Sequence, residues 1–485
     1  MAVYKHGTYG EFAPSIGDVA RESGTVAVYV GSAPVNLIRG YEAFVNKPIK
    51  LTDIDDVYNK LGYSSNWSMF PLCEAFKVHF NNEFGNIGPI VAINVFDPVK
   101  HKKSDATTES LSFVNGRATI KSDTIILDTI VLEGKVEGSD YALSYDFEKG
   151  QAVITSIGAD IVGPISATYY EIASVASYDD IIGGVTDTGV YTGLGVISRV
   201  YEELNLIPNL IVCPGKSSDA TVYKAMLNAA KKINGHWDAM VYADIDVSVS
   251  VNTIADAIST KASDGFNSEF SKVFWPKANG TDGNTYHISV LAAWATMLVD
   301  ASHDGVPMES PSNKVLPMVA SQCFCAEFAR DGFDQQQANT LNENGITTVV
   351  FWGGNWVLWG PHTAAYEHGS VEDKRSIFDN SVRMMMHISN SFQRDHALII
   401  DSPMTRAMAD TIKIREQEKA DALAAIGALI GTPVVEFKES ANSTADLVEG
   451  NFTWGFKGTP TPPFKSGTLQ VAYTTAGFNS YFGEV

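Results

Sequence analysis

The sequence has few basic residues and few cysteines. It contains 35 Lys and Arg against 56 Asp and Glu, which gives a formal net charge of −21. Binding to nucleic acid needs a clustered basic face, so we expect no nucleic-acid partner. The 4 cysteines in 485 residues exclude a disulfide framework, and Cys323 and Cys325 lie one residue closer than the usual zinc or redox spacing. We expect these cysteines to be reduced and structural.

Long apolar runs are also missing. No segment approaches the roughly 20 apolar residues that a helix needs to cross a bilayer. The first residues, MAVYKHGTYGEFAPSIGD, lack the apolar core of a secretory signal. We therefore expect folding in the cytosol and no membrane insertion.

Catalytic signatures are weak. CPGKSSDAT places Lys216 directly after a predicted strand, but the first glycine of a phosphate-binding loop is absent. Asp244 and Asp246 would lie at the carboxyl end of another strand, where open α/β sheets often bind ligands. The sequence offers them no companion base, nucleophile or metal cluster. We therefore expect no catalytic residue, cofactor or metal, and keep an α/β enzyme with a site near these three residues as an alternative.

Buried strands alternate with helices through most of the chain. Strands are predicted at 25–30, 89–96, 209–215, 238–245 and 271–276, and helices at about 69–84, 219–232, 252–262 and 287–301. Repeated strand–helix–strand units imply a largely parallel sheet covered by helices. Residues 346–360 predict a β-hairpin with Gly353, Gly354 and Asn355 in its turn.

The predicted fold class is α/β, with additions to this core. Short strands separated by glycine-containing turns predict a small antiparallel β domain inserted at 97–163. A helix is predicted at 403–430, with Ser402 as its N-cap, Pro403 as its first residue and Gly431 beyond its end. The expected organisation is an N-terminal arm (1–20), an α/β core in two parts (21–96 and 164–376) around the inserted domain (97–163), an α+β C-terminal domain with a Pro-rich spacer (377–467), and a C-terminal strand arm (468–485).

Both ends of the chain carry apolar residues in extended patterns. Leu469, Val471 and Tyr473 alternate with polar or small residues, as in a strand with one buried face. The N-terminal arm has apolar anchors among glycines. Unpaired strands are an aggregation hazard, so these arms need partners, either in a sheet of their own chain or in a neighbouring subunit. The candidate intersubunit-contact residues are Val3, Tyr4, Tyr9, Phe12, Leu469, Val471, Tyr473, Phe478 and Tyr481.

The stretch GGVTDTGVYTGLGVISRVYEELNLIPNLIVCPG, residues 183–215, resembles the core of contractile-tail sheath proteins of phages and phage-tail-like bacteriocins. Segments at 27–36, 76–97 and 342–364 resemble the same family in the same order. The inserted region carries no comparable signature. The start, VYKHGTYGEF, departs from the Pro-Gly-Val-Tyr type of N-terminus that is more usual in the family.

The resemblance implies a structural subunit without catalytic residues. Such subunits polymerise as stacked sixfold rings around an inner tube and exchange terminal strands with neighbouring copies. Their partners would be the tube protein and the baseplate and tail-terminator proteins. Contraction by rigid-body rearrangement would drive the tube through a cell envelope. Assembly would take place in the host cytoplasm, before release as part of a virion or bacteriocin tail. Another self-assembling lattice protein is the second alternative.

Overall fold

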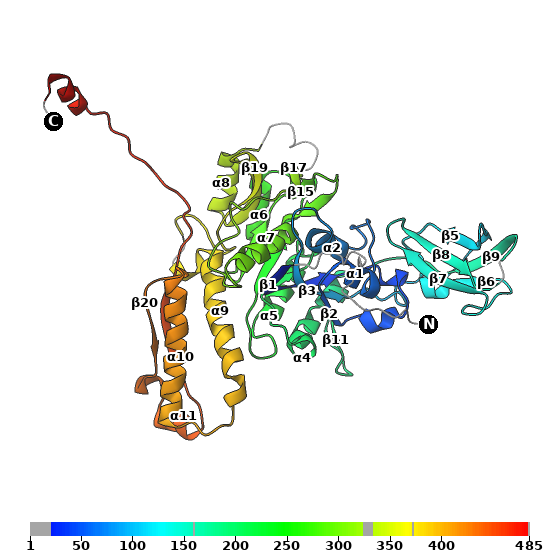
Figure 1. Cartoon of the computed structure of the whole chain (residues 1–485), viewed down its shortest axis with the longest axis horizontal. Helices are drawn as coiled ribbons and strands as arrows, with labels where there is room; N and C mark the ends of the chain where they lie inside the picture. Colours follow the sequence, from blue (N-terminus) through cyan, green and yellow to red (C-terminus); the bar gives the residue numbers. More distant parts are fainter. Residues whose placement is uncertain (1–20, 159–160, 324–332, 371–372, 484–485) are drawn as a thin grey trace, which may run out of the picture.

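A mixed eight-stranded sheet forms the centre of the computed structural model, which describes residues 21–158, 161–323, 333–370 and 373–483 (Figure 1). The strand order is β19-β18-β14-β13-β12-β1-β3-β2. The strands are β1 (Arg21–Gly31), β2 (Pro48–Leu51), β3 (Ile87–Asn94), β12 (Leu210–Val212), β13 (Met240–Asp244), β14 (Ser271–Phe274), β18 (Ile346–Trp352) and β19 (Asn355–Trp359). The inner pairs are parallel, and only the outermost pairs, β2–β3 and β18–β19, are antiparallel.

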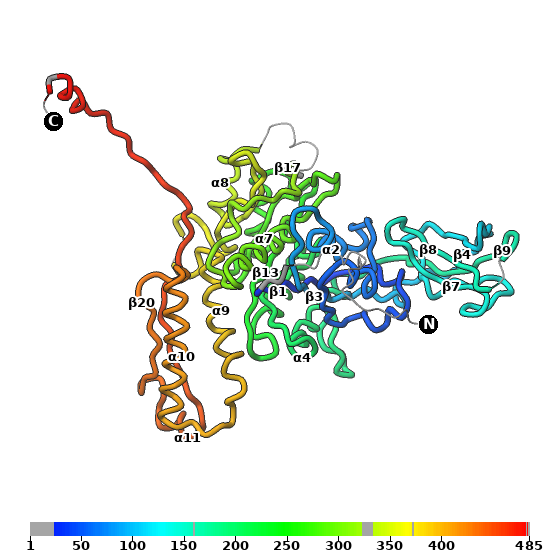
Figure 2. Tube along the Cα trace, in the orientation of Figure 1, coloured from blue at the N-terminus to red at the C-terminus, as the bar shows by residue number. Residues whose placement is uncertain are grey.

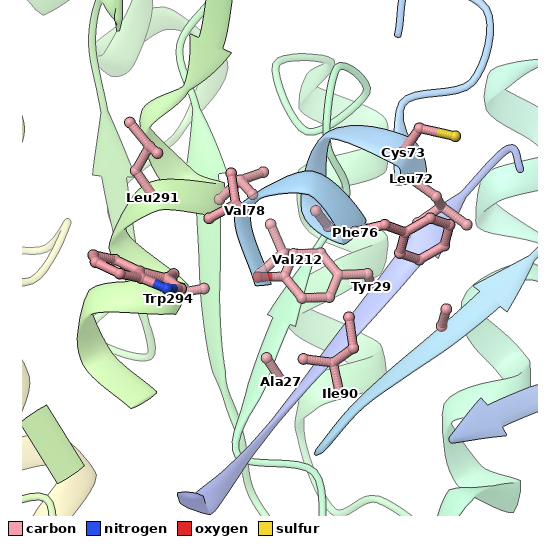
Figure 3. Packing of buried hydrophobic residues seen from close by; sticks show 14 of the residues in the cluster. Ala27, Tyr29, Leu72, Cys73, Phe76, Val78, Ile90, Val212, Leu291 and Trp294 are labelled. Atoms are coloured by element: carbon pink, nitrogen blue, oxygen red, sulfur yellow. The ribbon is translucent and has the colours of Figure 1, made fainter. Parts of the chain in front are cut away.

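Helices cover both faces of this sheet, as the near-continuous apolar strands require. On one face, α2 (Leu72–Phe80) and α7 (Ile288–Ser302) pack on side chains that include Ala27 and Tyr29 of β1. Figure 3 shows Phe76 of α2 and Trp294 of α7 in this cluster. On the other face, α5 (Ala220–Ala230) and α6 (Ile254–Asp264) pack against the alternate residues of the same strands. The predicted α/β core is therefore present, and Asp219 is the N-cap of α5.

Shorter elements complete the body. The helices are α1 (Ile54–Lys60), α3 (Tyr178–Ile182), α4 (Val200–Leu204) and α8 (Gln335–Glu343). Small antiparallel sheets are formed by β10 (Gly184–Val185) with β11 (Tyr191–Thr192), and by β15 (Lys277–Gly280) with β16 (Thr285–His287) and β17 (Val319–Cys323). The predicted hairpin at 346–360 is present as β18 and β19. Among the described residues, no helix has both the length and the hydropathy of a membrane span.

The inserted region forms two antiparallel sheets with a hydrophobic cluster of its own. The strands are β4 (Thr107–Ser112), β5 (Arg117–Ile120), β6 (Val131–Leu132), β7 (Tyr141–Asp146), β8 (Gln151–Ser156) and β9 (Pro164–Tyr169). One sheet has the order β4-β9-β6 and the other β5-β8-β7, and both contribute to the cluster that contains Leu111, Ile154 and Ala167. The expected end at residue 163 is too early, because β9 pairs with both β4 and β6.

Two long helices and a two-stranded sheet form the C-terminal unit, defined here as residues 379–460. Helices α9 (Asp379–His396) and α10 (Arg406–Ala425) run side by side away from the body (Figures 1 and 2). Between the two helices His396 Nε2 lies 2.8 Å from Glu416 Oε1, and Lys419 bonds to Asp395. A short helix, α11 (Thr444–Val448), separates β20 (Leu429–Glu436) from β21 (Gly455–Pro460).

The predicted helix at 403–430 is wrong at both ends. Helix α10 starts after Thr405, whose hydroxyl accepts a hydrogen bond from Met408 N at 3.2 Å. It ends at Ala425 because Gly427, with a φ of 80°, turns the chain into β20. Gly431 and Pro433 therefore lie within a strand, at a register shift that accommodates proline in the ladder.

Candidate intersubunit surfaces

The C-terminal arm, residues 461–483, projects away from the rest of the chain (Figures 1 and 2). Leu469, Val471 and Tyr473 are 86%, 85% and 82% exposed. A short 3-10 helix, η9 (Ala476–Phe482), holds Phe478 and Tyr481, which are also exposed. The arm thus displays its apolar side chains to solvent in the single chain.

The strand expected over Leu469–Thr475 is not formed in the single chain. These residues have no strand assignment, and no pairing with another described segment involves them. The simpler expectation, that the arm completes a sheet of its own chain, is therefore wrong for the described residues. The other candidate residues, Val3, Tyr4, Tyr9 and Phe12, lie outside the described residues, so their role stays a prediction.

The sheet β20–β21 is a surface that the sequence did not reveal. Leu429 and Val435 of β20 are buried against the helices, whereas Ile430 and Val434 are 49% and 40% exposed. Gln417 of α10 fixes the strand, because its side chain accepts from Val435 N at 2.8 Å and donates to Pro433 O at 3.0 Å. An isolated two-stranded ribbon is marginally stable in water, and a further strand would extend it.

The residues of the enzyme alternative do come together. Lys216, Asp244 and Asp246 line a cavity of about 190 Å³ at the carboxyl ends of β12 and β13, together with Lys277 and His287. The sequence placed them correctly, because parallel strands end at the same edge of a sheet. Their partners decide what this arrangement does.

The start of α7 is bonded to two buried carboxylates, Asp244 in the lining of this cavity and Glu74 of α2. Asp244 accepts hydrogen bonds from Ser289 N at 3.0 Å and from the Ser289 hydroxyl. Glu74 of α2 accepts from His287 N at 2.5 Å, and its other oxygen lies 2.7 Å from His287 Nδ1. Carboxylates stabilise a helix N-terminus by pairing with its free N–H groups and its positive end. Asp244 and Glu74 therefore have a structural role that explains their burial.

Negative charge at this helix end also raises the pKa of His287. Burial lowers the pKa of His287, but the Glu74 carboxylate outweighs it, so that the pKa lies above its ordinary value. Burial raises the pKa of the Cys213 thiol at the end of β12, against the opposing effect of a backbone hydrogen bond from Val30. Among the described residues, no cluster of His, Cys, Asp and Glu could hold a metal ion. The geometry thus supports a polar pocket whose buried carboxylate, Asp244, is hydrogen-bonded to the start of α7.

Comparison with known proteins finds relatives that are named as tail sheath proteins. No protein-family model matches the chain. A tail sheath protein of Burkholderia phage BcepMu is 25% identical over 467 residues, covering 92% of this chain and 91% of the relative. A prophage major tail sheath protein of Pseudomonas aeruginosa is 26% identical over 328 residues, covering 68% of this chain and 78% of the relative.

Solved structures agree in fold. A chain of the anti-feeding prophage baseplate superposes with a TM-score of 0.57 at 13% identity, covering 98% of this chain and 100% of that one. A chain of the PVC sheath complex, an extracellular contractile injection system in its contracted state, gives a TM-score of 0.55 at 12% identity, with 98% and 99% covered.

The resemblance to contractile-tail sheath proteins is confirmed. The fold of this chain, a parallel-rich sheet with several small antiparallel sheets, matches that of a chain of a solved sheath complex. The two relatives are named as tail sheath proteins, and sheath proteins of contractile tails are structural proteins and not enzymes. We accordingly interpret the carboxylate of Asp244 in the cavity near Lys216 as a cap of helix α7.

Proposed function

We propose that this chain is a subunit of a contractile tail sheath, which polymerises as stacked rings around an inner tube and contracts to drive the tube through a cell envelope. The observation that carries the proposal is the C-terminal arm. Its alternating apolar residues, Leu469, Val471 and Tyr473, are each more than four-fifths exposed in the single chain. Such a segment gains stability only when another surface covers it.

The surface we assign to the arm is the β20–β21 sheet of another copy. Adding an extended strand to a sheet uses backbone hydrogen bonds for affinity and side-chain pockets for specificity. About five or six new backbone hydrogen bonds would contribute roughly 3–8 kcal/mol, at roughly 0.5–1.5 kcal/mol each. Ile430 and Val434 offer exposed apolar side chains on this sheet. The N-terminal residues Val3, Tyr4, Tyr9 and Phe12 would take part in the same kind of exchange.

The domain arrangement suggests how a subunit would face its partners. We infer that the C-terminal unit faces the tube and that the inserted region, with its own hydrophobic cluster, lies on the outside. The exposed face of α10 is rich in charged residues, including Lys413, Arg415 and Glu418, which suits a polar partner surface. The baseplate and tail-terminator proteins would bind the two ends of the polymer. Assembly would take place in the host cytoplasm.

Electron microscopy of the purified chain tests this proposal. A sheath subunit should form hollow, transversely striated cylinders as its concentration rises or when tube protein is added. Flat lattices would instead favour another self-assembling structural protein. Protein that stays monomeric at high concentration, with and without tube protein, would contradict the proposal.

A further inference from the structure

The root of the C-terminal arm is bonded to the C-terminal unit at Thr461. Thr461 N donates to Ala428 O at 3.1 Å, and its hydroxyl donates to Gly427 O at 2.6 Å. Its carbonyl accepts from Asn380 Nδ2 at 3.0 Å, and the same amide nitrogen donates to Met308 O at 2.9 Å. Asn380 is only 2% exposed, so this anchor is held on a buried side chain.

Asn380 is itself attached to the central sheet. Its backbone N–H donates to Asp379 Oδ1 at 2.7 Å, and Asp379 Oδ2 accepts from Lys272 Nζ of β14 at 2.6 Å. Asp379 and Lys272 are fully buried. Two hydrogen bonds, from Asn380 N to Asp379 and from Lys272 to Asp379, therefore connect the anchor of the arm to β14 in the central sheet.

A second contact follows four residues along the arm. Lys465 Nζ lies 5.2 Å from the centroid of the Tyr366 ring and donates to the Tyr366 hydroxyl at 3.4 Å. The Tyr366 ring stacks on His362 with 3.6 Å between ring centroids, and His362 stacks in turn on Phe378. Tyr366 is 8% exposed. A fixed aromatic face is thus available to the Lys465 ammonium.

The segment between the two contacts is stiff. Pro462 and Pro463 lie between Thr461 and Lys465, and proline-rich segments are extended and semi-rigid. Ser466 and Gly467 follow, before the alternating apolar residues of the arm begin at Leu469. Two contacts on a stiff segment fix both the starting point of the arm and its direction, which a single contact would not do.

We propose that Asn380 and Lys465 are positioning residues that set the direction in which the C-terminal arm leaves the body. The use of that direction rests on the proposed strand exchange: an arm already pointed at one neighbour has a higher effective concentration at its receiving sheet than an arm that samples all directions. Loss of either contact widens the range of directions and raises the concentration needed for assembly. Neither residue touches the receiving sheet in this scheme.

Distance measurements on the monomer test the positioning role independently of assembly. Two spin labels, introduced as unnatural amino acids at Ser466 and at the exposed Ala262 of α6, report the spread of arm directions by pulsed electron resonance. We expect Asn380→Ala and Lys465→Met each to increase the width of the distance distribution between the two labels at least twofold. The matched control is Asn442→Ala, because buried Asn442 also donates to two carbonyls, those of Lys438 and Thr453, but at the far end of the C-terminal unit.

The outcomes separate the two proposals. Wider distance distributions in the two variants, with an unchanged control, support the positioning role. They do so even if the wild-type protein builds no tubes, because the absence of tubes would contradict only the proposed function. Unchanged distributions in both variants overturn the positioning role. If Asn380→Ala does not fold, Lys465→Met at its exposed site decides alone. Where tubes form, both variants should need a several-fold higher protein concentration to assemble, and they should still form tubes.

Discussion

The ion pair between Lys272 and Asp379 yields a quantitative prediction about how the C-terminal unit is joined to the body. Lys272 Nζ lies 2.6 Å from Asp379 Oδ2, and neither side chain is exposed. Lys272 also donates to Gly360 O at 2.6 Å. Burial lowers the pKa of Lys272, and the Asp379 carboxylate opposes that shift. The ammonium therefore depends on Asp379 to remain charged inside the protein.

Removing one partner should be much more costly than removing both. Asp379→Leu or Lys272→Met leaves an uncompensated buried charge, which costs about 3–5 kcal/mol of unfolding free energy. The double variant Lys272→Met/Asp379→Leu buries no charge, and its cost should be below either single cost because apolar replacements of buried pairs are often neutral. The expected coupling energy is therefore at least about 3 kcal/mol.

Urea unfolding, followed by tryptophan fluorescence and circular dichroism, measures these free energies on chains that lack residues 468–485. The matched control is the partly exposed pair Lys419–Asp395 between α9 and α10, with Nζ and Oδ2 2.8 Å apart. Its coupling energy should be only about 0–1 kcal/mol. Additive single effects in the Lys272/Asp379 cycle would refute the reasoning, because they would mean that the two charges do not stabilise one another.

Three further predictions follow from other contacts. Glu74 raises the folded-state pKa of His287, so the stabilisation by this pair is complete below the unfolded pKa of about 6.5 and is lost as pH rises through the folded pKa. Over that pH interval the wild type should lose more unfolding free energy than His287→Gln. Parallel pH profiles of the two proteins in chemical denaturation would contradict this. Replacing residues 107–169 with a short Gly/Ser linker should leave a folded chain that still assembles, as judged by circular dichroism and microscopy, whereas loss of all soluble protein would place the region in the core. Val471→Pro should reduce assembly in sedimentation assays because it removes a backbone donor and an apolar side chain. Thr461→Pro cannot serve as its control, because Thr461 N is hydrogen-bonded to Ala428 O.

Local patterns were sufficient to predict much of the core. The apolar run at 25–30 and the hairpin at 346–360 match β1 and β18–β19, since burial on both faces and turn glycines leave clear sequence signals. The end of α10 was mispredicted because Gly427 and Gly431 are both plausible helix ends, and tertiary packing of Leu429 in β20 decides between them. Helix propensity alone does not carry that information.

Long-range partnerships were beyond the sequence patterns. Glu74 and His287 are 213 residues apart, and Lys272 lies in an apolar strand 107 residues from Asp379. Nothing in local periodicity pairs such residues, although a lysine within SKVFWP is itself a signal that a buried carboxylate is needed. Lys216, Asp244 and Asp246 were correctly placed at one sheet edge, but the engagement of Asp244 by Ser289 of α7 depends on the fold.

The central claim, that the C-terminal arm pairs with another copy of the chain, is tested most directly by deleting residues 468–485. Because Leu469, Val471 and Tyr473 are almost fully exposed in the single chain, the deletion should move the melting temperature of the monomer by less than about 2 °C. The same deletion should abolish tubes in sedimentation and electron microscopy. A collapse of monomer stability, or tubes that form as readily as those of the complete chain, would contradict the account.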